Sequence, residues 1–369
     1  MRHTRIMKTL KMKKNMYLFL PLLLIMLVSF LTMYNARYVS VTYNNHLNKQ
    51  LLWYLLAFII SFLVYKSNKI KLLFRFSFLI YIFNILLLIL VLFFGKEVNG
   101  ARAWFRIGSI SIQPSELMKL SYSLYLTTII SKYKHKNLKS DFKFLLKVII
   151  LFLIPSIFIF LEPDTGAIIF LFVITICMLF ASEIKKRWFV FLFFFLLLLI
   201  GIFLFLFYFN QDLLIKLIGT SFFYRMDRLI EFDNMQLENA LIAIGNAKFF
   251  GSGFKNISIY IPEAATDFAF ALTISIFGFI TGLLLIVCYF LLDYYFLKIV
   301  FHTKNKTTRL FTSGFIGVFI FSQIYNMLMN IGFMPIMGIP LPFLSYGGST
   351  LIVYFLYGTI ILYQTTKNI

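Results

Sequence analysis

Apolar runs long enough to cross a lipid bilayer recur along the whole chain, and this feature limits the fold more than any other. A membrane-spanning helix needs about 20 mostly apolar residues. Of the 369 residues, 61% are apolar and only 13% are charged, whereas soluble domains carry about 25% charged residues. Helices are the simplest way to satisfy the backbone polar groups of such runs in a bilayer. The sequence therefore predicts an all-α polytopic membrane protein.

We predict ten transmembrane helices within a single membrane domain, residues 1–369. They are placed at 16–33, 51–65, 72–94, 114–131, 142–161, 166–182, 187–208, 266–292, 310–332 and 349–366. A large loop, about 209–265, separates the seventh span from the eighth. Its stretch Leu237–Ile244 is amphipathic and is followed by glycines, which indicates short interfacial or re-entrant helices.

The basic residues predict the orientation of the chain. The net charge is +21, and Lys and Arg gather before the first span and in the loops near 66–75, 132–147, 185–187 and 298–309. Basic residues favour the cytoplasmic side of a membrane, so both termini are expected in the cytoplasm. This alternation argues for membrane topology and against a nucleic-acid partner. Most acidic residues fall in the opposite loops, which places the expected chemistry on the outer face.

The segment Ile261–Phe270 joins the large loop to the eighth span and contains Asp267, four residues after Glu263. A carboxylate at the mouth of a membrane helix is a candidate functional group, because its burial is unfavourable unless it faces water or a partner. The alternative is a helix start, in which Thr266 caps the helix and Asp267 complements its dipole. The local sequence leaves both interpretations open.

A second polar stretch precedes the fourth span. Pro114 suits the first position of a helix, and Glu116 and Lys119 then lie three residues apart on one helical face. They are expected to form a pair that serves either membrane insertion or function. Arg102 and Arg106 flank Trp104 in the preceding segment, which suggests an interfacial anchor or a clamp for a phosphate group.

Two further turns stand out. In Glu162–Gly166, Asp164 is placed to cap the sixth span, although a functional role carries similar weight. Near the end, three prolines precede Ser345–Ser349. This segment predicts a rigid loop whose Ser and Gly residues cap the last span.

Five segments together resemble the SEDS family (shape, elongation, division and sporulation), which contains the RodA and FtsW proteins. They read QPSELMK, EPDTG, LIAIGNAKFFGSG, PEAATDFAF and GIPLPFLSYGGS, in that order. The resemblance implies a peptidoglycan glycosyltransferase that polymerises lipid II at the outer face of the bacterial cytoplasmic membrane. It also implies a class B penicillin-binding protein as the partner transpeptidase.

The resemblance also implies roles for individual residues. Asp267 matches the aspartate that the family needs for polymerisation, and would act as the general base of an inverting reaction that releases undecaprenyl pyrophosphate. Positive charge for this leaving group is expected from the protein or from a divalent cation, Mg²⁺ or Mn²⁺. The supporting or substrate-binding candidates are Glu116, Lys119, Asp164, Glu263, Arg102 and Arg106. The chain departs from the family pattern at Ala265, where His is usual, and at Ser275 and Ile276, where a Glu pair is common.

Two other functions remain open from the sequence. A flippase or transporter for the lipid-linked precursor would use Glu116 and Lys119 along a path through the bilayer, but the outward bias of the acids argues against it. A non-catalytic scaffold that activates a transpeptidase is the other alternative. The GIPLPF run from Gly338 favours a RodA-like role in elongation over an FtsW-like role in division.

Overall fold

The computed structural model describes residues 2–98, 101–108, 110–220, 235–256 and 259–367. Over these residues the chain is mostly helical. Its long helices are Arg2–Ala36 (α1), His46–Lys66 (α2), Ser77–Phe94 (α4), Pro114–Lys132 (α5), Leu138–Leu161 (α6), Thr165–Phe180 (α7), Arg187–Phe209 (α8), Ala269–His302 (α12), Lys306–Asn330 (α13) and Gly348–Thr366 (α14). Short helices are Ile70–Arg75 (α3), Gln211–Ile218 (α9) and Met235–Asn246 (α11), with a 3₁₀ turn at Val41–Tyr43.

Nine of the ten predicted spans each overlap one long helix, and the third overlaps both α3 and α4. Among the described residues, seven helices are long and apolar enough to cross a membrane by length and composition: α1, α2, α4, α6, α8, α12 and α13. The helix α7 is apolar but shorter, and α5 and α14 are more polar helices of 19 residues each. The protein is therefore a multi-pass membrane protein, while the count of ten spans stays a prediction.

Some boundaries differ from the prediction. The third span, expected at 72–94, is divided at Phe76 into α3 and α4. The eighth, expected to end at residue 292, continues to His302. In the large loop, α9 and α11 confirm short helices and α11 contains Leu237–Ile244, while 221–234 lies outside the described residues.

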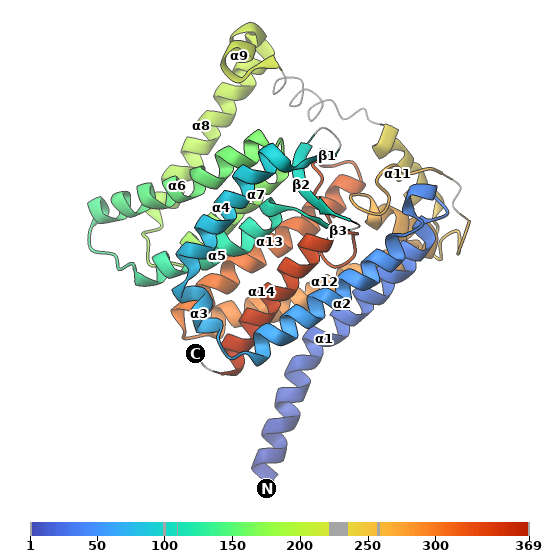
Figure 1. The fold of residues 1–369 in the computed structure, drawn as a ribbon, viewed down its shortest axis with the longest axis horizontal. Coiled ribbons are helices and arrows are strands. Elements are labelled where there is room, and N and C mark those ends of the chain that lie inside the picture. The colour runs from blue at the N-terminus through green and yellow to red at the C-terminus, as the bar shows by residue number, and fades with distance from the viewer. Residues whose placement is uncertain (1, 99–100, 109, 221–234, 257–258, 368–369) are drawn as a thin grey trace.

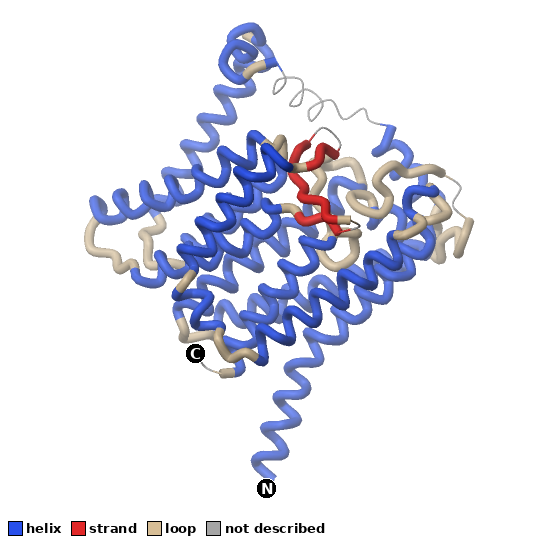
Figure 2. The backbone as a smooth tube through the Cα atoms, in the orientation of Figure 1, coloured by secondary structure: helices blue, strands red, loops and turns tan. Residues whose placement is uncertain are grey.

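The helices pack around one continuous core. Neighbouring pairs include α14 with α2, α1 with α12, and α13 with both α12 and α7. Figures 1 and 2 show both chain termini at one end of the bundle and the strands and α11 at the other. The helix α8 leans away from the bundle, and its apolar side chains are largely exposed. Such faces suit contact with lipid tails.

A small antiparallel sheet, which the sequence analysis did not predict, lies at the end opposite the termini. Its strands are Lys96–Val98 (β1), Ala101–Ile107 (β2) and Ile110–Ile112 (β3), in the order β1-β2-β3. Side chains alternate between the two faces of a strand, so Arg102, Trp104 and Arg106 share one face of β2.

The helix α12 is interrupted at Gly278, which has a φ of 81°. A break inside a bilayer leaves backbone groups without their helical partners, and the loop around Gly251 supplies new ones. The backbone N–H groups of Ser252 and Gly253 donate to the carbonyls of Ser275 and Ile276 at 2.9 and 3.0 Å. In return, the N–H groups of Phe279 and Ile280 donate to the carbonyls of Lys248 and Phe249 at 3.1 and 3.3 Å. The part of α12 around Gly278 is thereby joined to the large loop.

This junction predicts a strict need for glycine at two positions. A Cβ at Gly278 would lie 2.1 Å from the carbonyl oxygen of Phe249, and one at Gly251 would lie 2.1 Å from that of Ile276. Both residues also have positive φ, which is strained for other residues. We expect Gly278→Ala and Gly251→Ala to lower the thermal unfolding temperature of the purified protein in detergent.

The matched control is Gly245→Ala in α11, where an added Cβ meets nothing within 4 Å. Alanine is favoured over glycine in helices by about 1 kcal/mol, so this variant should unfold at the same temperature or higher. An equal loss in all three variants would contradict the role of the junction.

Candidate functional site

Asp164 joins two of the polar motifs at the end of the bundle that carries the sheet. Its Oδ1 accepts a hydrogen bond from the backbone N–H of Ala167 at 3.2 Å and so caps α7, as predicted. Its Oδ2 accepts from Gln113 Nε2 and from Ser115 Oγ, both at 2.8 Å. One carboxylate therefore holds the start of α7 against the start of α5.

Glu116 and Lys119 form the predicted pair, one turn further along α5. Lys119 Nζ lies 2.7 Å from Glu116 Oε1, and the side chains are only 2% and 8% exposed. The ammonium also lies 4.0 Å from the centre of the Phe170 ring of α7, a favourable cation–π position. Neither Lys119 Nζ nor Glu116 Oε2 has a well-aligned hydrogen-bond partner among the described residues. The pair is buried but retains hydrogen-bonding capacity.

Asp267 lies in a turn just before α12, and the turn does not have the predicted capping arrangement. The N-cap residue of α12 is Phe268, without a side-chain cap. Thr266 Oγ1 instead donates to the Glu263 carboxylate at 2.7 Å. Glu263 has a φ of 51°, which is uncommon for a non-glycine residue. No described group donates a hydrogen bond to the Asp267 carboxylate. The predicted capping by Thr266 is therefore wrong, while the interaction of Asp267 with the helix dipole stays a prediction.

Two asparagines of α13, which the sequence analysis missed, hold the backbone at Asp267. Asn326 and Asn330 are fully buried, and their Nδ2 groups donate to the Asp267 carbonyl at 2.9 and 3.0 Å. Asn330 Oδ1 accepts from the backbone N–H of Ala271 at 3.0 Å and thus satisfies the first turn of α12. Two asparagines four residues apart in a membrane helix are the signal that could have found them.

The loop between α13 and α14 borders both carboxylates. A Cβ at Gly338 would lie 3.8 Å from Asp267 Oδ2, and one at Gly166 would lie 3.0 Å from the Met337 carbonyl and 3.9 Å from Asp164 Oδ1. Asn326 Nδ2 also donates to the Ile339 carbonyl at 2.8 Å. Asp164 and Asp267 thus both lie near Met337 and Gly338 of this loop.

The last loop caps α14 with a glycine, as predicted, but not with a serine. The N-cap is Gly347, without a side-chain cap, and Ser349 Oγ accepts from the backbone N–H of Gln113 at 3.0 Å. The N–H of Tyr346 donates to the Ala265 carbonyl at 2.8 Å. The serine therefore holds α5 to α14, and the tyrosine backbone holds the Asp267 turn.

Burial raises the pKa of three carboxyl groups in the turns of this site. The pKa of Asp267 rises to about 7 because of burial, with a further contribution from the negative charge of Glu263. Burial raises the pKa of Asp164 despite its hydrogen bond from Ser115. Burial and the neighbouring Asp164 raise the pKa of Glu162 to about 9, and neither oxygen of Glu162 has a described partner. Glu162 therefore holds its proton at neutral pH, while Asp267 titrates there.

Arg102 and Arg106 are exposed on β2, and no described ion pair joins them to the carboxylates. Among the described residues, no group of three or more His, Cys, Asp or Glu side chains is placed to hold a metal ion. The described side chains alone therefore supply no complete ligand set for the expected Mg²⁺ or Mn²⁺, and no step below depends on one.

The fold and the site together define a polytopic helical membrane protein that gathers buried carboxylates and a lysine at the end of the bundle bearing the sheet. Residues 12–368 match the family model FTSW_RODA_SPOVE, described as cell cycle protein. The chain belongs to this family.

Curated relatives and solved structures agree with this assignment. A probable peptidoglycan glycosyltransferase FtsW from Buchnera aphidicola subsp. Schizaphis graminum is 32% identical over 326 residues, covering 83% of this chain and 86% of the relative. Another from Wigglesworthia glossinidia brevipalpis is 33% identical over 336 residues, with coverages of 83% and 80%. The rod shape determining protein RodA of Thermus thermophilus has a TM-score of 0.67 at 25% identity, covering 94% and 96%. A chain of a peptidoglycan synthase complex has a TM-score of 0.77 at 24% identity, covering 94% and 97%.

The buried pair predicts a non-additive response to mutation. Glu116→Gln and Lys119→Met each leave one buried charge uncompensated, so each should reduce the amount of folded protein in the membrane. The double variant removes both charges and should recover that amount. If the pair also serves chemistry, glycan polymerisation should stay low in the double variant. Wild-type polymerisation by the double variant would limit the pair to membrane insertion.

Proposed function

We propose that this protein is a peptidoglycan glycosyltransferase that polymerises lipid II at the outer face of the bacterial cytoplasmic membrane. The observation that carries the proposal is the environment of Asp267, which fixes its backbone and raises the pKa of its side chain. Its backbone carbonyl is held by Asn326 and Asn330, whereas no described group bonds to its carboxylate. Its pKa of about 7 suits a general base, because the ideal pKa lies near the working pH.

In the proposed reaction, Asp267 removes the proton from the 4-hydroxyl of the acceptor GlcNAc. The hydroxyl oxygen attacks the anomeric carbon of the MurNAc of a lipid-linked donor. The bond from that carbon to the pyrophosphate breaks, undecaprenyl pyrophosphate leaves, and the configuration inverts. Glu263 lies beside the base in the same turn and raises its pKa, which helps the carboxylate accept the proton.

Cationic groups balance the charge that develops on the pyrophosphate. Lys119 is the buried candidate, supported by its unused hydrogen-bonding capacity. Arg102 and Arg106 are the exposed candidates, and their shared face of β2 suits contact with a phosphate group. Asp164 holds the start of α5 in place through Gln113 and Ser115. A need for Mg²⁺ or Mn²⁺ remains part of the proposal, and assays with and without EDTA test it.

The proposed partner is a class B penicillin-binding protein that crosslinks the new strands. The similarity in fold to a chain of a peptidoglycan synthase complex supports a shared assembly.

The proposed role covers elongation and division, because the curated relatives above bear the FtsW name and the Thermus structure bears the RodA name. The alternatives give other results when the purified protein is incubated with labelled lipid II. A flippase would only translocate the lipid, and a scaffold would cause no reaction.

Asp267→Asn tests the assignment of the base. The substitution is nearly isosteric, so polymerisation of lipid II by the purified protein should fall by about 10²-fold or more, the usual scale for general-base catalysis. Protein level and transpeptidase binding should persist. Asp267→Glu should recover little activity, since the longer side chain displaces the carboxylate. Near-normal glycan synthesis by well-folded Asp267→Asn would remove Asp267 from the mechanism.

The same assay across pH provides a second readout. Only the ionised carboxylate accepts a proton, so the wild-type rate should fall as pH drops below about 7. In the unfolded chain an Asp loses its proton near about pH 4, whereas in the folded protein Asp267 keeps its proton up to about pH 7. The free energy of unfolding therefore declines as the pH rises from about 4 to about 7. Asp267→Asn removes that penalty, and its unfolding temperature above pH 7 should not be below that of the wild type.

The orientation of the site needs its own test. The basic loops near 66–75, 132–147 and 298–309 support cytoplasmic termini and an outward-facing Asp267. Topology reporters fused after Lys139 and after Lys304 should give cytoplasmic signals. A reporter fused near Asn256 should signal the outer side, and a cytoplasmic signal there would overturn the proposed location of the active site.

A further inference from the structure

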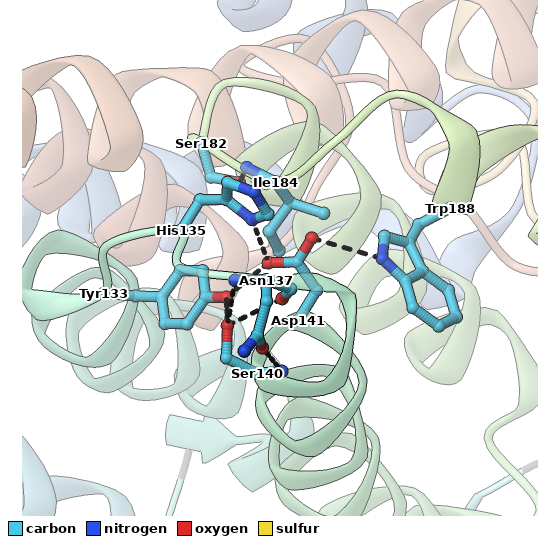
Figure 3. Close-up of polar contacts among 8 residues, drawn as sticks. All are labelled: Tyr133, His135, Asn137, Ser140, Asp141, Ser182, Ile184 and Trp188. Atoms are coloured by element: carbon cyan, nitrogen blue, oxygen red, sulfur yellow. Dashed lines mark hydrogen bonds and ion pairs between the residues drawn. The ribbon is translucent and has the colours of Figure 1, made fainter.

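The end of the bundle opposite the sheet contains a polar cluster that the proposed reaction does not use. Its centre is Asp141 in the first turn of α6, whose side chain is fully buried. Asp141 Oδ1 accepts a hydrogen bond from the Tyr133 hydroxyl and lies 2.8 Å from His135 Nδ1. Oδ2 accepts from Trp188 Nε1 at 3.3 Å. Figure 3 shows these side chains converging on the carboxylate. One residue thus joins the segment after α5, the start of α6 and the start of α8.

A second link adds α13 to the same cluster. Lys306 Nζ lies 2.9 Å from Glu183 Oε1 and donates to the Tyr133 carbonyl at 2.9 Å. Asn137 and Ser140 form a capping box at the start of α6, so this helix begins at a fixed place. The loops on both sides of α6 are therefore held together by specific bonds.

The surface around this cluster is rich in cations that form no described ion pair. Asp141 and Glu183 are its acidic residues, and both are already bonded. Among the described residues, none of the exposed cations around them forms an ion pair. They are Lys132, Lys134, Lys136, Lys139, Lys143, Lys147, Lys185, Lys186 and Arg187.

The first turns of α6 show what kind of anion fits this surface. Lys139, Lys143 and Lys147 recur every four residues and therefore form a row along the helix. Leu138, Phe142 and Leu146 form the adjacent row and are 48%, 55% and 48% exposed. An uncovered apolar row on a membrane helix faces lipid tails, so the lysines beside it reach the level of the lipid phosphates.

The turn before α8 brings further cations to the same place. Trp188 binds Asp141 and its ring lies 6.0 Å from that of Phe142, centre to centre. This contact places Lys185, Lys186 and Arg187, which directly precede Trp188, beside the lysine row of α6. The cations thus come from α6 and from the start of α8 with the turn before it. The buried carboxylate of Asp141 joins these two segments.

We propose that this surface binds the phosphate headgroups of anionic phospholipids in the adjoining membrane leaflet, with the lysine row of α6 at its centre. The apolar row accounts for the choice of lipid over a soluble acidic partner, because only a lipid supplies acyl chains next to its phosphate. The Asp141 cluster fixes the spacing of the cations. This site is separate from Asp267 and does not depend on the proposed glycosyl transfer.

The test measures the thermal unfolding temperature in nanodiscs of phosphatidylcholine with increasing fractions of phosphatidylglycerol, and counts retained lipids by native mass spectrometry. Phosphatidylglycerol should raise the unfolding temperature of the wild type. The triple variant Lys139→Gln, Lys143→Gln, Lys147→Gln should lose most of this rise and retain phosphatidylglycerol about tenfold less, since each lysine contributes to attraction by an anionic leaflet. Inorganic phosphate alone should not reproduce the rise, because it lacks acyl chains.

The matched control is Lys66→Gln, Lys69→Gln, Lys71→Gln, which removes three exposed lysines where α2 ends and α3 begins. It should keep the response to phosphatidylglycerol, and an equal loss in both triple variants would overturn the proposal in favour of diffuse surface charge. The variant Asp141→Asn separates a built site from net charge. It makes the protein more positive, so net charge alone predicts more bound phosphatidylglycerol. Because it also weakens the Asp141 cluster, we expect less. Binding of a poly-glutamate peptide without any response to phosphatidylglycerol would assign the surface to an acidic protein instead.

Discussion

The need to pair every backbone polar group inside the bundle governs how the candidate site is built. The chain departs from regular helix at Gly278 and in the turn before α12, and in both places another segment supplies the missing partners. The loop at 248–253 fills the break, and Asn330 accepts from the N–H of Ala271. Because unpaired backbone groups are so unfavourable in a bilayer, these contacts stabilise the part of α12 that precedes Gly278.

The consequence for Asp267 is a separation between its backbone and its side chain. The carbonyl is bonded twice, by Asn326 and Asn330, and the neighbouring Ala265 carbonyl is bonded by Tyr346. The carboxylate, in contrast, has no described donor. A group that must take a proton from a substrate needs both properties, since a fixed position aligns it and bound donors would lower its basicity.

The sequence predicts features that depend on local spacing. The helices follow from the length of the apolar runs, Pro114 begins α5, and Asp164 caps α7 from the position before it. Glu116 and Lys119 pair because residues three apart share a helical face. The family resemblance also rests on short segments, and the family match over residues 12–368 confirms it.

Features that depend on distant partners escape this kind of prediction. Thr266 looks like a helix cap, yet α12 takes its partner from Asn330, which lies 59 residues from Ala271. Ser349 looks like a cap for α14, yet it bonds to Gln113 instead. In the sequence, Gly278 is simply a glycine in an apolar run. The need for glycine there becomes clear only from its close contact with the backbone at Gly251. The sheet at 96–112 has strands of three to seven residues, too short to show a clear period.

In the proposed reaction, two features of the buried site reduce the electrostatic cost of an anion near Lys119. Glu162 keeps its proton, because its pKa is about 9, and therefore adds no negative charge beside Asp164. Glu116 neutralises Lys119 through one oxygen only, and Lys119 has no well-aligned hydrogen-bond acceptor of its own. In the proposed reaction, a pyrophosphate at Lys119 would use this remaining hydrogen-bonding capacity. Proton retention by Glu162 and the incomplete bonding of Lys119 act in the same direction, since both lower the free energy of an anion at this end of the bundle.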